Sequence, residues 1–151
     1  MKRVFSFCIV LMAAILCLGA QQGTEKREWS YFGSTPVTGD QFFFDVSSVK
    51  RGTGETVSVN IKKVVKDPQP MIRMRTAQGQ SVKGYDRLDN IQALWELDCK
   101  GARVATTSET HYDRDGKVLE HRSFQKKEWS PISADSLADQ LKGKVCGIAV
   151  K

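Results

Sequence analysis

The feature that most constrains the fold of this chain is a pair of cysteines, Cys99 and Cys146, that follows an apolar N-terminal segment. Two further cysteines, Cys8 and Cys17, lie within that segment. If the segment is an export signal, the mature chain keeps two cysteines in an oxidising compartment, where an even number indicates a disulfide. We therefore expect one bond between Cys99 and Cys146. The alternative is a pair of unpaired, buried thiols.

Residues 1–20 have the pattern of a secretory signal peptide. Lys2 and Arg3 give a positive start, residues 4–18 are uncharged and mostly apolar, and the segment closes on the small residue Ala20. We expect cleavage after Ala20 or one residue earlier, with export to the periplasm or the outer cell surface. The alternatives are lipidation of a leader cysteine, which the bulky residues before each cysteine disfavour, and an uncleaved anchor of short length for a membrane span.

The remainder of the chain has the size of one domain. We expect residues 29–151 to form that domain and residues 21–28 to form a flexible, polar lead-in. The chain carries a net charge of +6, with its lysines and arginines spread along the sequence. Scattered basic residues are typical of a solvated surface, and they also suit anionic partners. No nucleic-acid-binding motif accompanies them, so no nucleic-acid partner is predicted.

Alternation of apolar and polar residues predicts about six strands in an antiparallel meander. The clearest alternation places Val57, Val59 and Ile61 on one face of a strand. The strands are predicted at residues 29–32, 41–46, 56–66, 91–99, 102–112 and 117–124. Short polar turns join the last three, and Gly116 suits the positive φ of the final turn.

The same alternation assigns side chains to faces of the sheet. Cys99 shares parity with Trp95 and Leu97, which predicts that it lies on the buried face. Residues 42–44 are three consecutive phenylalanines. We expect them to belong to the core, with an exposed aromatic strand as the alternative.

One amphipathic helix is predicted near the C-terminus. Ser133 is the expected N-cap, and Asp135 in the first turn suits the helix dipole. The apolar stripe consists of Ala134, Leu137, Ala138, Leu141 and Val145. We expect this helix to lie on the sheet, to end or turn near Cys146, and to be pinned there by the bond to Cys99. The predicted fold is therefore α+β, mainly β.

Residues 67–89 are the least informative part of the sequence. They contain two prolines and several basic residues but little periodicity. A short helix and a long mobile connection both stay open for this segment.

Several short motifs, in their order and spacing, resemble the bacterial surface-adhesin protein E family. They are Trp29-Ser30-Tyr31, Phe43-Phe44-Asp45, Trp95-Glu96-Leu97-Asp98-Cys99, residues 112–119, residues 129–132 and Val145-Cys146. The resemblance covers residues 28–147 and implies an antiparallel sheet with a C-terminal helix, joined by a disulfide between Cys99 and Cys146. It also implies binding of host extracellular-matrix proteins and the capacity to dimerise. It transfers no ligand-binding residue, because residues 67–89 match no motif of the family.

No catalytic, cofactor or metal site is predicted. The candidate acids and bases are Asp98, Glu109, His111, Asp113, Asp115 and His121. Glu109 and His111 share a strand face, which is more typical of a surface polar pair than of a catalytic one. Asp113 and Asp115 resemble the start of a calcium loop, but its later ligands are missing and a hairpin turn explains both. The spacing of the histidines and cysteines fits no zinc motif.

The sequence thus predicts an exported, non-enzymatic binding protein for a protein or polysaccharide ligand. The alternative is a periplasmic accessory, assembly or inhibitor protein on the same scaffold. A homodimer formed by an edge strand is compatible with both.

Overall fold

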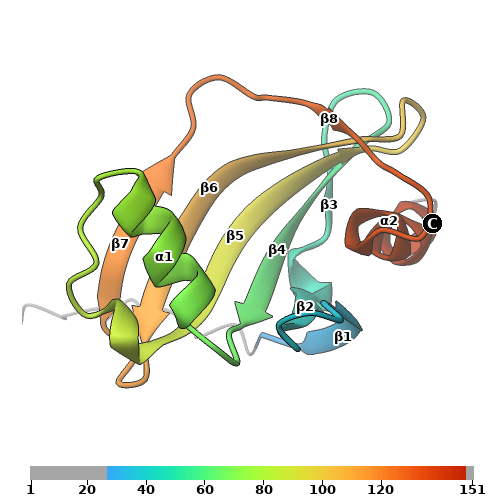
Figure 1. Cartoon of the computed structure of the whole chain (residues 1–151). Coiled ribbons are helices and arrows are strands. Elements are labelled where there is room, and N and C mark those ends of the chain that lie inside the picture. The colour runs from blue at the N-terminus through green and yellow to red at the C-terminus, as the bar shows by residue number, and fades with distance from the viewer. Residues whose placement is uncertain (1–26, 149–151) are drawn as a thin grey trace, which may run out of the picture.

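The computed structural model describes residues 27–148, in which eight strands form one twisted sheet (Figure 1). Six strands follow the meander order β1 (Trp29–Ser34), β2 (Gln41–Asp45), β4 (Thr56–Val64), β5 (Leu88–Asp98), β6 (Arg103–Asp113) and β7 (Val118–Ser123). The two-residue strands β3 (Lys50–Arg51) and β8 (Ser130–Pro131) pair with β4 and β6. All pairings are antiparallel, which confirms the predicted meander.

The two faces of the sheet have different surroundings. Both helices lie on one face, which we call the inner face (Figure 1). Val57, Val59 and Ile61 of β4 point to this face and are buried in the core. Phe42 and Phe44 join the same core, as predicted. The core prediction is wrong for Phe43, which points to the opposite, outer face because successive side chains of a strand alternate.

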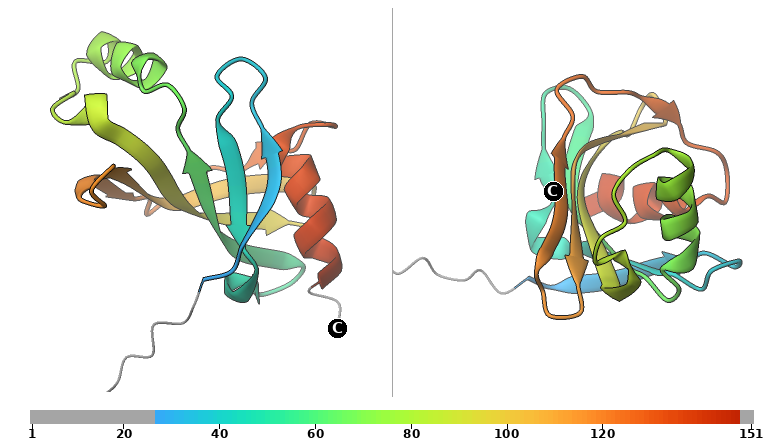
Figure 2. Two further views of the ribbon diagram at one scale, coloured as in Figure 1. Left: turned by 90° about the horizontal axis from the view of Figure 1, so that it is seen from below. Right: turned by 60° about the vertical axis from the view of Figure 1, so that its left-hand side comes forward.

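Helix α2 (Leu137–Ile148) covers one end of the inner face (Figure 2). Leu141 and Val145 are fully buried against the sheet, as the predicted stripe requires. Cys99, directly after β5, is bonded to Cys146 of α2, with 5.9 Å between the Cα atoms. The predicted link between strand and helix is confirmed.

The predicted start of this helix is wrong. Ser136 is the N-terminal cap, because its hydroxyl accepts a hydrogen bond from the Asp139 amide at 3.2 Å. The Asp139 carboxylate in turn accepts from the amide of Asp135, which has a φ of 60° and precedes the helix. Ser133 therefore lies in the connection and not at the cap. The C-terminal end agrees with the prediction, since the described helix ends at Ile148, close to Cys146.

Helix α1 (Gln69–Ala77) covers the other end of the inner face (Figure 2). It is followed by the 3-10 turn η2 (Tyr85–Arg87), so the short-helix alternative for residues 67–89 is the correct one. A second, smaller core forms here from Tyr85, Leu88 and Ile91, and α1 packs against it. The third short helix, η1 (Val46–Ser48), connects β2 to β3.

The predicted signal peptide, residues 1–20, and most of the predicted lead-in lie outside the described residues. Within residues 27–148, neither helix is long and apolar enough to cross a membrane.

Candidate functional site

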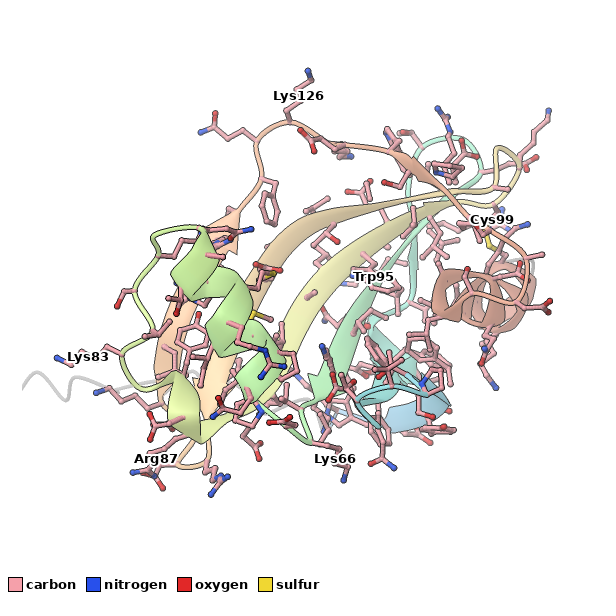
Figure 3. All side chains as sticks on the ribbon, in the orientation of Figure 1. Lys66, Lys83, Arg87, Trp95, Cys99 and Lys126 are labelled. Carbon is pink, nitrogen blue, oxygen red and sulfur yellow. A yellow bond between two sulfur atoms is a disulfide. The ribbon has the colours of Figure 1, made fainter. Side chains whose placement is uncertain are left out.

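Between the two covered ends, the inner face carries a hollow of about 670 Å³. Its floor consists of Trp95 on β5 and of Val104 and Thr106 on β6. Its wall is formed by the end of β7, the connection that follows and the start of β8: Ser123, Phe124, Gln125, Lys126, Glu128 and Ser130. Figure 3 shows Trp95 near the middle of the sheet and Lys126 on the segment that rises above it. The volume is in the range of sites for small ligands.

The hollow results from an interruption at one edge of β6. Strands β7 and β8 both pair with β6, but residues 124–129 between them leave the sheet as a raised segment, which we call the arch (Figure 1). A bulge occurs at the same place, because Leu94 pairs with Ser108 while Trp95 pairs with Thr106. An extra residue in one strand bends it and increases its twist. The bend and the arch together leave the centre of the inner face uncovered.

Most polar side chains in the hollow have no partner among residues 27–148. In the described part of the chain, no side-chain hydrogen bond or ion pair involves the polar groups of Thr106, Gln125, Lys126, Glu128 and Ser130. Lys127, by contrast, is bonded to Glu96 at 2.7 Å, which fastens the arch to β5. This ion pair thus fixes the arch that borders the hollow, while the polar side chains of the hollow can form hydrogen bonds with a ligand.

A second group of polar side chains, beside α1, is satisfied internally. We call Arg75, Tyr85, Glu109, His111 and Glu120 the polar cluster. The Arg75 guanidinium donates to Glu120, and the Tyr85 hydroxyl donates to the same carboxylate at 2.7 Å. The Tyr85 oxygen also lies 2.8 Å from Nδ1 of His111. These contacts join α1 and η2 to β6 and β7.

The polar cluster corrects one prediction from the sequence. Glu109 and His111 do lie close together, with 3.5 Å between a carboxylate oxygen and Nε2. They are not a surface pair, however, because His111 is only 3% exposed and faces the interior under η2. The bulge in β6 and the cover supplied by α1 place this pair inside.

Charge in the polar cluster is stabilised by close partners. Although burial alone would raise the pKa of the Glu120 carboxyl, hydrogen bonds from the Tyr85 phenol and from two guanidinium groups lower it to about 2. Burial and the neighbouring carboxylate raise the pKa of Tyr85. The hydrogen bond to His111 is the main reason why the pKa of Glu109 is lowered. These groups are already bonded to one another, and none of them lines the hollow.

The outer face carries an aromatic and basic surface near the start of the described chain. We call Arg27, Trp29, Tyr31, Phe43 and Lys62 the outer patch. Tyr31 is 50% exposed, and its ring meets that of Phe43 edge to face with centres 5.7 Å apart. The Lys62 ammonium lies 4.6 Å from the centre of the Trp29 ring.

The two cations of the outer patch have no carboxylate partner within salt-bridge distance among residues 27–148. Arg27 donates instead to Gln92 at 2.6 Å. Partial burial lowers the pKa of Lys62, and the more distant Asp89 carboxylate opposes this effect only in part. An acidic group brought to this surface would improve the environment of that charge.

The structure does not bring the other candidate acids and bases together. Asp113 accepts from the amides of Asp115 and Lys117, each at 2.9 Å, so both aspartates belong to the hairpin turn as predicted. Asp98 pairs with Arg103, and His121 lies beside Thr110. In the part of the chain that the structure describes, no group of three acidic, histidine or cysteine side chains is placed to hold a metal ion.

A family model described as surface-adhesin protein E matches residues 29–147, nearly the whole described chain. This chain belongs to the surface-adhesin protein E family. The resemblance noted in the sequence motifs is therefore confirmed, and the family points to a surface adhesin. No curated protein has a sequence that matches the chain.

Solved structures of Haemophilus influenzae protein E share the fold. Crystal form II of that protein matches with a TM-score of 0.50 and 11% identity, covering 73% of this chain and 83% of the other. The selenomethionine form matches with a TM-score of 0.50 and 9% identity, covering 78% of this chain and 85% of the other. At such low identity the likeness concerns the fold alone.

Two surfaces of this surface-adhesin protein E member were not predicted from its sequence. The outer patch has a signal, because Trp29 and Tyr31 alternate with Phe32, and residue 43 alternates with the two core phenylalanines. The sequence signal for the hollow is weaker. Trp95 was correctly assigned to the sheet face that carries the core, and the last predicted strand ends at residue 124, but no local pattern indicates that the chain then returns to pair with β6 as β8.

Proposed function

We propose that this chain is a non-enzymatic adhesin on the outer cell surface and that the outer patch binds a host extracellular-matrix protein. The observation that carries this proposal is the uncovered sheet face with three aromatic rings and two cations that lack carboxylate partners within the described residues. The family supports a surface role. The proposed export depends on removal of residues 1–20 as a signal peptide.

The chemistry of the outer patch suits a protein ligand with an acidic segment. Tryptophan, tyrosine and arginine are enriched among the residues that contribute most to protein–protein affinity. Tyr31 offers a ring that is already half exposed, so binding would bury apolar area at low entropic cost. A carboxylate near Lys62 would stabilise an ammonium whose charge partial burial disfavours. We therefore expect affinity to decrease as salt increases.

The absence of catalysis is part of the proposal. The closest acid–base pair, Glu109 and His111, lies in the polar cluster. There the Tyr85 hydroxyl is hydrogen-bonded to His111, and Arg75 donates to the neighbouring Glu120. Through His111 and Tyr85 the pair contributes to the attachment of η2, and this supports a structural role.

Tyr31→Ala should weaken binding to the matrix ligand about 30-fold, which corresponds to about 2 kcal/mol for a hot-spot residue. Lys62→Gln should weaken it less and should reduce its dependence on salt. The measurement is surface plasmon resonance of the mature protein against a panel of purified extracellular-matrix proteins. Val118→Ser, a matched change at a residue that is 49% exposed on β7, should leave binding unchanged. Equal binding by the Tyr31 and Val118 variants would contradict the assignment of the surface.

The proposed location has its own test. Protease added to intact cells should degrade a surface-displayed adhesin, and mass spectrometry of the mature protein should find that residues 1–20 are absent. Protection until the outer membrane is opened would exclude surface display and favour the periplasmic accessory role. Homodimerisation stays a prediction from the sequence, with β1 and β7 as the two edges of the six-strand order.

A further inference from the structure

The hollow under the arch is distinct from the outer patch because it opens on the other face of the sheet. Trp95 faces the hollow, whereas Phe43 and Lys62 pair on the outer side of the neighbouring strands. A ligand in the hollow therefore need not compete with a protein on the outer patch. The two surfaces can be tested separately.

We propose that the hollow binds a neutral saccharide, with the C–H face of one sugar ring packed against Trp95. The floor supplies the aromatic surface, and Phe124 on the wall adds a second ring that is 40% exposed. A sugar ring has an apolar face and a rim of hydroxyl groups. It therefore matches a site that combines an aromatic floor with a polar wall.

The charges around the hollow favour a neutral ligand. Its lining contains one cation, Lys126, and one anion, Glu128. Their charges cancel, so the site offers no net attraction to a phosphate, a carboxylate or an ammonium group. Both side chains are exposed on the arch, where they serve as hydrogen-bond donor and acceptor for hydroxyl groups.

The available polar groups distinguish the hollow from the polar cluster. In the polar cluster, Arg75, Tyr85 and Glu120 are bonded to one another. Around the hollow, Thr106, Gln125, Lys126, Glu128 and Ser130 have no side-chain hydrogen bond or ion pair in the described part of the chain. Hydroxyl, amide, ammonium and carboxylate groups together can accept from and donate to the rim of a sugar.

A second, smaller hollow beside α1 has a mainly apolar lining and serves as a comparison. It measures about 410 Å³ and lies between α1, β4 and the loop that joins β1 to β2. Most of its lining is apolar, including Val37, Met71 and Met74. Such a surface has few partners for hydroxyl groups. It therefore provides a place for control variants within the same protein.

The saccharide could come from two sources that share this chemistry. One is neutral polysaccharide of a bacterial envelope, and the other is a host glycan without sialic acid. An extended peptide is the competing occupant, and it would have to place an apolar side chain on Trp95. The uncharged saccharide, with an apolar ring face and a rim of hydroxyl groups, fits the mixed polar and apolar lining with its balanced charges better.

The test is a titration of the mature protein with neutral trisaccharides of glucose, mannose and N-acetylglucosamine, followed by NMR and tryptophan fluorescence. At least one trisaccharide should bind with a dissociation constant of about 1 mM, as expected for a small ligand in an open site. Amide shifts should concentrate on the arch and on β6. Separate titrations with bacterial neutral O-polysaccharide and with desialylated host glycans then distinguish the two sources.

Variants assign the site. Trp95→Ala should weaken binding at least tenfold, whereas Trp95→Phe should retain most of it because a ring remains on the floor. Since Trp95 also touches the main core, the exposed double variant Gln125→Ala/Glu128→Ala gives an independent answer. That variant should fold normally and weaken binding about tenfold. Val37→Ala in the smaller hollow is the matched control and should change nothing.

Several results would overturn the proposal. One is that no saccharide binds at a concentration of about ten times the expected dissociation constant. Another is that the amide shifts are confined to the outer patch. A third is that an uncharged peptide binds and no saccharide does. Failure here is distinguishable from failure of the proposed adhesin function. Tyr31→Ala should leave saccharide binding unchanged, and the arch variant should leave matrix-protein binding unchanged.

Discussion

Cys146→Ser should lower the midpoint of thermal unfolding by about 10–15 °C. The bond joins residues 47 positions apart in the sequence. A loop of this length restricts the unfolded chain enough to contribute about 4 kcal/mol to the free energy of unfolding. For a chain of this size, each kcal/mol corresponds to about 3–4 °C. This is the largest effect that we expect from a single substitution outside the core.

Few other contacts hold helix α2 on the sheet, so the disulfide contributes much of its attachment. Helix α2 reaches the core mainly through Leu141 and Val145, since its remaining side chains are wholly or partly exposed. Cys99 anchors the helix to the end of β5, the central partner of both β4 and β6. Loss of the bond should therefore release α2 first and expose the core residues that it covers.

Calorimetry of the oxidised and reduced proteins provides the measurement. The reduced wild type, Cys99→Ser and Cys146→Ser should unfold at similar temperatures, and reductant should have no effect on either variant. The double variant should resemble the single ones, because both changes remove the same bond. A wild-type midpoint that does not respond to reduction would show that the bond is incidental to stability.

The parts of the fold that follow a local period could be predicted from the sequence. Val57, Val59 and Ile61 alternate with polar residues, so strand β4 and its buried face follow directly. Leu141 and Val145 are four residues apart, which defines the buried stripe of α2. The helix start was misplaced because Ser133 and Ser136 both offer capping hydroxyls, and only the position of Asp139 favours the second one.

The hollow and the polar cluster could not be predicted because they depend on contacts between distant residues. Residues 106–110 are polar on both faces of β6, so alternation gives no register and the bulge that opens the hollow leaves no trace in the sequence. Arg75 looks like another surface cation, yet it is 5% exposed. Its counter-charge, Glu120, is 45 positions away. No local pattern connects the two.

Glu120→Ala should lower the free energy of unfolding by about 3 kcal/mol, because it leaves the buried Arg75 guanidinium without its counter-charge. The same change removes the acceptor of the Tyr85 hydroxyl. Since these contacts attach α1 and η2 to β7, hydrogen exchange in Gln69–Ala77 should accelerate more than exchange in β4. Glu55→Ala, at an exposed glutamate with no side-chain partner among the described residues, is the matched control.

The effect of Glu120→Ala should depend on pH in a defined direction. Folding lowers the pKa of Glu120 from 4.5 to about 2, so the folded protein binds fewer protons than the unfolded chain between these values. The stabilisation by this carboxylate is therefore fully present above pH 4.5 and is lost as the pH falls through about 2. The difference in unfolding free energy between wild type and variant should be constant near neutrality and should shrink in acid. Urea titrations at pH 7, 4 and 2.5 measure this difference, and a gap that stays constant across the series would show that Arg75 does not depend on the charge of Glu120.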